Sequence, residues 1–231
     1  MLAAACVPTQ LPGRQATIAY TSPFLAFVVL LGMGRAFGWP LQFVYPVQFL
    51  IVTALLLKVS RPFVSLRPSR PWASIAIGIL VFVVWVAPDM LFGYRHYWLF
   101  DNFLTGSAVS SLAPDLQRNW PFLVLRTLTS MALVPILEEL FWRGWLMRWL
   151  IDTDFQKVPP GTYTPQAFWL VAVLFASEHG PYWEVGLIAG IVYNWWMVRS
   201  RSLADCIVAH AVTNGLLAVY VVSGGHWQYW L

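Results

Sequence analysis

The sequence predicts an all-α, polytopic membrane protein with about seven to eight transmembrane or partly inserted helices around a polar intramembrane cavity. Hydrophobic residues make up 59% of the 231 residues and charged residues only 10%, which is unlike a soluble domain. Several uncharged runs approach the roughly 20 residues that a helix needs to cross a bilayer. Lipid cannot satisfy backbone hydrogen bonds, and long continuous apolar runs favour helices over a closed barrel. We therefore expect residues 1–231 to form a single integral membrane domain.

The first three spans are expected where the first three long apolar runs lie, at residues 17–34, 41–57 and 72–90. A turn at Gly38-Trp39-Pro40 separates the first two runs. The segment 91–119 is rich in aromatic and small residues, and aromatic residues concentrate where the membrane meets water. We expect this segment to be a partly interfacial loop.

The fourth span is predicted as one long helix over residues 120–149, followed by a polar turn. Thr164-Pro165 then forms a good helix start, because threonine caps a helix and proline suits its first turn. That helix should run to His179, where Gly180-Pro181 ends it. The hairpin formed with the next helix should enter the membrane only partly. The last two helices are expected at residues 182–198 and 203–222.

Basic residues concentrate in connections between the spans. Lys58, Arg61, Arg67 and Arg70 lie between the second and third spans without an acidic residue. Placing this connection in the cytoplasm puts about ten of the 14 basic residues inside, as the positive-inside rule requires. The charge is thus a topological signal and does not indicate nucleic-acid binding. We expect a protein of the bacterial plasma membrane with a cytoplasmic N-terminus and an outer C-terminus.

Ionisable side chains inside the apolar segments are the strongest functional signal, because unneeded intramembrane charge is costly. Glu138 and Glu139, two of only four glutamates in the chain, are adjacent in the fourth span. Glu139 and Arg143 lie one helical turn apart and can form an ion pair. Glu138 is rotated about 100° from Glu139 around the helix axis, so it remains available as a base for water.

Two further apolar segments each carry a histidine, His179 and His210. Asn214 follows His210 by one turn, so the two side chains share a face and present hydrogen-bond donors that suit a developing oxyanion. A structural role is the alternative for each group taken alone. Glu138 would then be a second hydrogen-bonded carboxylate, His179 a helix cap and His210 an interhelical hydrogen-bonding residue.

These segments resemble the CAAX protease and bacteriocin-processing (CPBP, or Abi) family of intramembrane endopeptidases. The family motifs are Glu-Glu-x-x-x-Arg, Phe-x-x-x-His and His-x-x-x-Asn or Asp, and they occur here in the same order. The resemblance covers about residues 133–216, within an expected catalytic half at about 120–222. It implies hydrolysis of a peptide bond near the cytoplasmic side of the membrane, in a membrane-tethered, lipidated or leader-type peptide.

The resemblance also implies a role for each motif residue. Glu138 would activate water with help from His179, and His210 with Asn214 would hold the oxyanion. The residues expected to support them are Glu139, Arg143 and Phe175.

No cofactor is favoured, although the family has also been described as zinc-dependent. If zinc were used, Glu138, His179 and His210 would be its ligands. The chain has no His-Glu-x-x-His helix, and asparagine is a poor zinc ligand. We therefore favour a glutamate-type peptidase over a metalloprotease.

Two other functions remain open at this point. The first is a non-catalytic membrane scaffold or immunity protein of the same family, which would bind the same kind of peptide without cutting it. The second, less favoured, is a proton-coupled transporter with intramembrane carboxylates. In every case the expected partners are a membrane peptide or protein and the lipid bilayer, with no nucleic acid.

Overall fold

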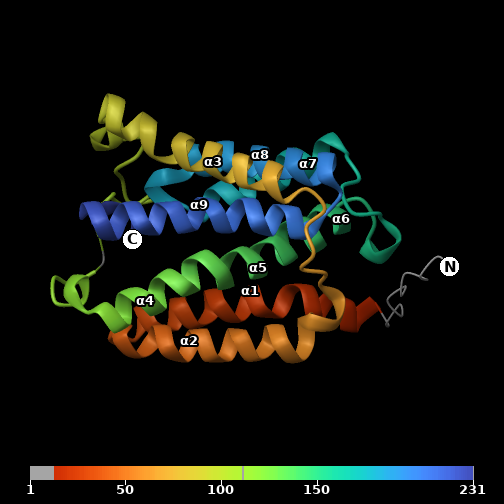
Figure 1. Cartoon of the computed structure of the whole chain (residues 1–231), viewed down its shortest axis with the longest axis horizontal. Coiled ribbons are helices and arrows are strands. Elements are labelled where there is room, and N and C mark those ends of the chain that lie inside the picture. The colour runs from red at the N-terminus through yellow and green to blue at the C-terminus, as the bar shows by residue number, and fades with distance from the viewer. Residues whose placement is uncertain (1–12, 111, 231) are drawn as a thin grey trace.

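The computed structural model describes residues 13–110 and 112–230, and within these ranges the chain is helical without any strand (Figure 1). The predicted all-α polytopic fold is confirmed. The α-helices are α1 (Gly13–Ala36), α2 (Leu41–Leu55), α3 (Pro71–Phe92), α4 (Trp120–Leu128), α5 (Val134–Glu139), α6 (Met147–Trp149), α7 (Pro165–Ser177), α8 (Trp183–Ser200) and α9 (Leu203–Gly224).

Helices α4, α5 and α6 form one continuous rod, because π-helical turns at Thr129–Leu133 and Leu140–Leu146 join them. Five helical segments in the described part of the chain are long and apolar enough to cross a membrane. They are Gly13–Ala36, Leu41–Phe63, Pro71–Phe92, Trp120–Trp149 and Leu203–Gly224.

Helices α7 and α8 form a hairpin beside these spans. Helix α7 has 13 residues, a length of about 20 Å, which is shorter than a bilayer core. Its start follows the prediction, because the Thr164 side chain accepts a hydrogen bond from the Ala167 backbone N–H at 3.3 Å. Its end does not: the helix stops at Ser177, and His179 lies in the turn that follows.

The helices pack in two groups that face each other (Figure 1). Helices α1, α2, α4 and α5 lie on one side, and α3, α7, α8 and α9 lie on the other, while the α6 end of the rod reaches α7. Helix α9 packs against α3, α8 and the rod, so it joins the two groups. Its contact with α3 is close, because a Cβ on Gly78 would collide with the Ala209 carbonyl and the Val212 side chain.

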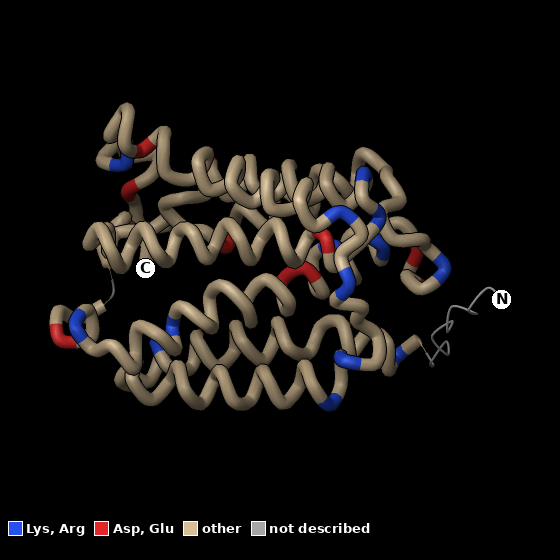
Figure 2. Tube along the Cα trace, in the orientation of Figure 1, with Lys and Arg blue, Asp and Glu red and all other residues tan. Residues whose placement is uncertain are grey.

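The two ends of the bundle differ in charge (Figure 2). We call the end formed by the connections 56–70, 150–164 and 199–202 the basic face, and the end formed by the connection 93–119 and the segment after α9 the C-terminal face. The basic residues in the basic-face connections are Lys58, Arg61, Arg67, Arg70, Lys157, Arg199 and Arg201.

Candidate active site

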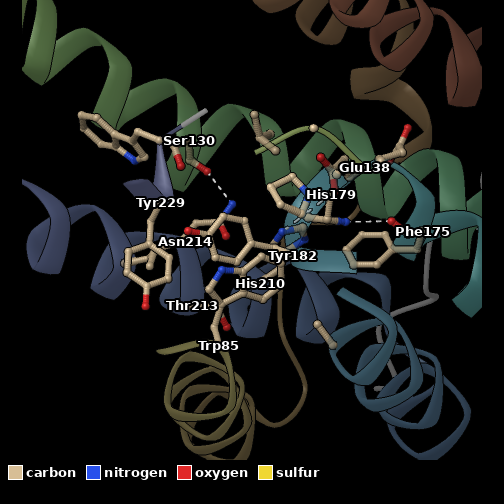
Figure 3. A pocket seen from close by; sticks show the side chains of 18 of the residues that line it. Trp85, Ser130, Glu138, Phe175, His179, Tyr182, His210, Thr213, Asn214 and Tyr229 are labelled. Atoms are coloured by element: carbon tan, nitrogen blue, oxygen red, sulfur yellow. Dashed lines mark hydrogen bonds and ion pairs between the residues drawn. The ribbon is translucent and has the colours of Figure 1, made fainter. Parts of the chain in front are cut away.

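Four of the side chains singled out in the sequence line one cavity. It has a volume of about 500 Å³ and lies between the rod, α9 and the α7–α8 turn (Figure 3). Glu138 comes from α5, His179 from the turn, and His210 and Asn214 from α9. The fold therefore brings together groups from three separate segments. Their catalytic roles stay predictions.

Glu139 does not line the cavity but lies buried behind it, where it contacts the side chains of Arg143 and His210. Its Oε1 accepts a hydrogen bond from Arg143 Nη1 at 3.1 Å, and the Nδ1 atom of His210 lies 2.9 Å from the same oxygen. The side chains of Glu139 and Arg143 are both 0% exposed. The ion pair predicted from the four-residue spacing is thus present, and it also orients His210.

Arg143 joins the rod to helix α8. Its Nε donates to Asn194 Oδ1 at 2.9 Å, and Nη2 donates to the Gly190 carbonyl at 3.3 Å. The guanidinium lies 4.6 Å from the centre of the Phe175 ring, a cation–π contact. Phe175 therefore supports the arginine, and the motif residues of two segments share one buried network.

Asn194 is a member of this network that the motifs did not predict. It is fully buried, and its Nδ2 donates to the Phe168 carbonyl at 2.8 Å. The available signal was a lone asparagine inside an otherwise apolar helix, because such polar groups need partners within the membrane.

His210 is held in one tautomer by Glu139. A carboxylate can only accept, so the proton of the neutral ring lies on Nδ1 and the lone pair lies on Nε2. The Nε2 atom is 4.0 Å from Glu138 Oε2, which is too long for a hydrogen bond. A water molecule has room to bridge the two atoms by donating one hydrogen bond of about 2.8 Å to each of them.

His179 is held by the backbone of its own motif. Its Nδ1 lies 2.8 Å from the Phe175 carbonyl oxygen (Figure 3). Because a carbonyl only accepts, Nδ1 carries the proton and Nε2 is left with a lone pair. The ring packs edge-on against Trp85, with centroids 5.1 Å apart. It also fits against Gly186, where a Cβ would come within 3.0 Å of the ring.

Asn214 is oriented by the first π-helical turn of the rod. Its Nδ2 donates to the Ser130 carbonyl at 2.9 Å. In a regular α-helix that carbonyl would accept from Val134 N–H, but here Val134 N–H bonds to the Thr129 carbonyl one residue earlier. The π-helical turn thus makes the Ser130 carbonyl available to α9. One N–H of Asn214 is therefore committed, and the other remains for a ligand.

A second network fixes the turn that carries His179. Arg95 Nη1 donates to the Pro181 carbonyl at 2.5 Å, and Arg95 Nη2 lies 2.7 Å from Glu184 Oε1. Tyr94 donates to the same glutamate oxygen at 2.7 Å. Burial, together with this hydrogen bond, raises the pKa of Tyr94 to about 12, so the hydroxyl stays a donor. Glu184 is thus paired with a buried arginine at the turn.

Metal independence stays a prediction. A catalytic zinc site needs three protein ligands. The described parts of the chain contain no group of three or more His, Cys, Asp or Glu side chains placed to hold a metal. The chemistry of the site is therefore derived from its own side chains.

Comparison with known proteins identifies the segment that contains these residues. Residues 119–216 match the Rce1-like family, described as type II CAAX prenyl endopeptidase Rce1-like. No curated protein and no solved structure matches the chain. The matched segment contains all three motifs and every residue that forms the Glu139 network and the cavity groups described above. Residues 119–216 are therefore similar to the Rce1-like family, in agreement with the CAAX protease-related (CPBP) resemblance of the motifs.

Proposed function

We propose that the protein is an intramembrane endopeptidase that hydrolyses a peptide bond in a membrane-associated peptide with a water activated by glutamate and histidine. One observation carries this proposal: a carboxylate and two imidazole Nε2 lone pairs face a single cavity between membrane-spanning helices. Such groups are retained inside a membrane mainly where they have a function.

In the proposed reaction, Glu138 takes a proton from a water molecule and His179 Nε2 orients that water. The water oxygen attacks the carbonyl carbon of the scissile bond, and the carbonyl oxygen becomes an oxyanion. The remaining N–H of Asn214 donates to that oxyanion, as does His210 Nε2 when the ring is protonated. Glu139 compensates the positive charge of such a ring. The C–N bond then breaks, and the leaving amine takes the proton from Glu138.

The proposal includes the site of action. The spanning helices place the protein in a membrane, and the charge of the basic face favours its location in the cytoplasm. We propose a bacterial plasma membrane, with the N-terminus inside and the C-terminus outside. The substrate is a membrane-tethered, lipidated or leader-type peptide, and no metal takes part.

The decisive experiment substitutes Glu138→Gln and compares membrane peptides by proteomics in cells with the variant and the wild type. A peptidase loses its activity, and uncut substrates accumulate, while SDS-induced unfolding in mixed micelles is unchanged. Asp115→Asn, an exposed carboxylate in the 93–119 connection, is the matched control and should behave as wild type.

The same experiment discriminates the alternative functions. A scaffold or immunity protein would keep its phenotype in Glu138→Gln cells and show no change in peptide ends. A proton-coupled transporter would show pH-driven flux in proteoliposomes that the substitution abolishes. Either result would contradict the peptidase proposal.

A further inference from the structure

Along the rod and α9, the cavity extends from the catalytic groups toward the C-terminal face. On the rod its lining residues are Ser130, Val134 and Glu138, so it includes none beyond Glu138 toward the basic face. On α9 its lining begins at His210 and continues through Thr213, Asn214 and Leu217 toward the C-terminal face. Among the described residues of the rod and α9, Glu138 and His210 therefore lie at the inner end of the cavity.

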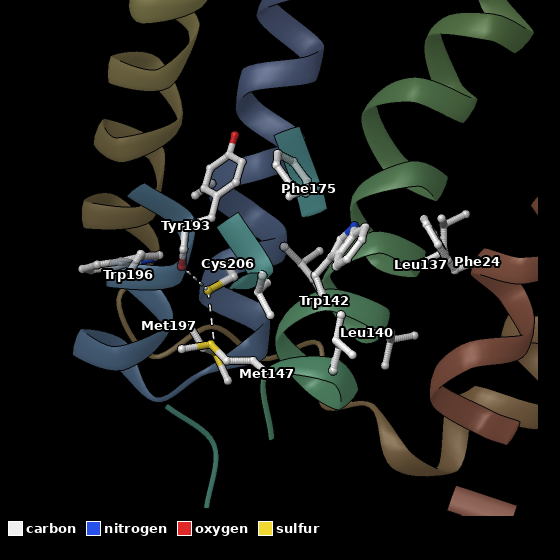
Figure 4. Close-up of a cluster of buried hydrophobic side chains, with 14 of the residues drawn as sticks. Phe24, Leu137, Leu140, Trp142, Met147, Phe175, Tyr193, Trp196, Met197 and Cys206 are labelled. Atoms are coloured by element: carbon white, nitrogen blue, oxygen red, sulfur yellow. Dashed lines mark hydrogen bonds between the residues drawn. The ribbon is translucent and has the colours of Figure 1, made fainter. Parts of the chain in front are cut away.

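Beyond Glu138 on the rod and before His210 on α9, toward the basic face, the bundle is filled by side chains of a buried hydrophobic cluster, part of which is drawn in Figure 4. They include Leu140, Trp142, Met147, Met197 and Cys206. These residues are 5% exposed or less, so no passage for a peptide exists there in this state.

The opposite end of the cavity is open. Its exposed lining residues include Gly106, Ser107 and Val109 from the 93–119 connection. From Ser130 to Glu138 the rod rises by roughly 12 Å, at 1.5 Å per residue. An extended peptide rises about 3.3–3.6 Å per residue, so the cavity has room for a short extended segment that enters from the C-terminal face.

The open end carries a positive charge. Arg35, in the last turn of α1, lines the cavity and is exposed. It takes part in none of the ion pairs found among the described residues, and the other charged side chains in the described lining are Glu138 and Glu178. A guanidinium in this position suits a carboxylate, which it can bind through two parallel hydrogen bonds.

We propose that substrate reaches Glu138 from the C-terminal face, on the outer side of the membrane, and that Arg35 binds a carboxylate of the peptide at the mouth of the cavity. The identity of the ligand rests on the proposed function, the end of the bundle from which it enters rests on the cavity geometry, and the assignment of that end to the outer side rests on the orientation proposed above. Entry from the outer side differs from what the family resemblance implied, which was hydrolysis near the cytoplasmic side of the membrane. The carboxylate belongs either to the end of the peptide chain or to an aspartate or glutamate side chain.

The direction of entry is tested by cysteine labelling, which needs no catalysis. In a Cys6→Ser background, single cysteines are introduced by Ser130→Cys in the cavity, Ser107→Cys at its mouth and Ser65→Cys in the 56–70 connection. Cys206 is kept, because it is 0% exposed. A membrane-impermeant maleimide is applied to right-side-out and to inverted membrane vesicles.

We expect the cysteines at positions 107 and 130 to react in right-side-out vesicles, and the cysteine at position 65 to react only in inverted ones. Reaction of the cavity cysteine only in inverted vesicles would overturn the proposal. So would a failure of that cysteine to react from either side while the one at position 107 reacts. Because these outcomes do not depend on activity, they are separate from a failure of the peptidase proposal.

The role of Arg35 is tested with a peptide recovered uncut from Glu138→Gln membranes. The peptide is prepared with a free or amidated chain end, and with its acidic side chains intact or changed to amides. Arg35→Gln should raise KM by roughly fivefold, the size of a partly exposed ion pair, with kcat unchanged. Arg35→Lys should restore most of the affinity. Arg118→Gln, an exposed arginine of the 93–119 connection, is the control.

The peptide whose KM no longer changes in Arg35→Gln identifies the carboxylate that Arg35 binds, because in that peptide this carboxylate has been replaced by an amide. An unchanged KM in Arg35→Gln, or the same change in Arg118→Gln, would overturn the assignment. If no uncut peptide is found at all, the proposed function fails, whereas the labelling result still decides the direction of entry.

Discussion

Arg143→Met is expected to destabilise the protein strongly, because the arginine compensates a fully buried carboxylate. Both side chains of the Glu139–Arg143 pair are 0% exposed, and their nearest N and O atoms are 3.1 Å apart. Methionine has a similar length but leaves Glu139 with His210 as its remaining partner among the described residues. The substitution also removes the donors to Asn194 Oδ1 and to the Gly190 carbonyl.

The expected magnitude follows from these three losses. Removing one partner of a buried ion pair typically costs about 3–5 kcal/mol. Each orphaned buried acceptor costs about 1–3 kcal/mol when it has no other partner. These terms are not additive within one network, so we expect the upper end, about 5 kcal/mol. That is a large share of the roughly 5–15 kcal/mol by which folded domains are stable.

The double substitution Glu139→Leu with Arg143→Met separates stability from catalysis. It removes both charges, and replacing a buried pair by apolar residues is often close to neutral. We expect it to recover most of the free energy of unfolding. Peptidase activity should stay lost, because the acceptor that fixes His210 Nδ1 is gone.

Arg148→Met is the matched control. Arg148 is also buried, but its described hydrogen bonds go to the carbonyls of Val158 and Gly144, at 2.7 and 3.0 Å, and it does not line the catalytic cavity. We expect a cost of about 1–3 kcal/mol with activity retained. Stability is measured by reversible SDS unfolding in mixed micelles, and activity with a cleaved peptide. A loss below about 1 kcal/mol in Arg143→Met, or full activity in the double variant, would refute the role given to this network.

Two further predictions concern His179 and metal dependence. In Gly186→Ala the new Cβ would lie 3.0 Å from the His179 ring, so the ring must shift and weaken its bond to Phe175; activity should fall by at least roughly tenfold. Gly32→Ala, with no atom within 4 Å of the new Cβ, should keep full activity and gain about 0.5–1 kcal/mol, and equal activity in both variants would contradict this role. Exhaustive chelation, with the metal content assayed, should leave activity unchanged, whereas a loss that zinc restores would show that the metal-independent mechanism is wrong.

The positions of the spans could be predicted because run length and hydropathy determine which segments cross a bilayer. Their ends were less accurate for a physical reason. Helix α1 extends back to Gly13 and α2 continues through a π-helical turn to Ser60, past Arg14 and Lys58. Charged residues are tolerated at the ends of membrane helices, where long side chains reach the interface. A search for uncharged runs therefore cuts helices short.

The Glu139–Arg143 pair was predictable because a four-residue spacing is a local property of a helix. The contacts of His210 with Glu139 and of Asn214 with Ser130 were not, because they join residues 71 and 84 positions apart. The π-helical turns also gave no usable signal, since their sequences are those of ordinary apolar helices. The direction in which the cavity opens depends on packing between all of these helices, so the motifs alone could not indicate it.

The geometry explains why the first motif needs two adjacent glutamates. A carboxylate bonded to Arg143 and His210 is held in place behind the cavity, so it cannot reach a water molecule inside it. A carboxylate that lines a cavity without a cation in contact is a better base, but it cannot also anchor the arginine. Adjacent positions on a helix differ by about 100°, which directs Glu139 into the buried network and Glu138 into the cavity. The rotation of about 100° between neighbouring residues thus separates structural support from chemistry. His210 lies between the two carboxylates, 2.9 Å from Glu139 and 4.0 Å from Glu138.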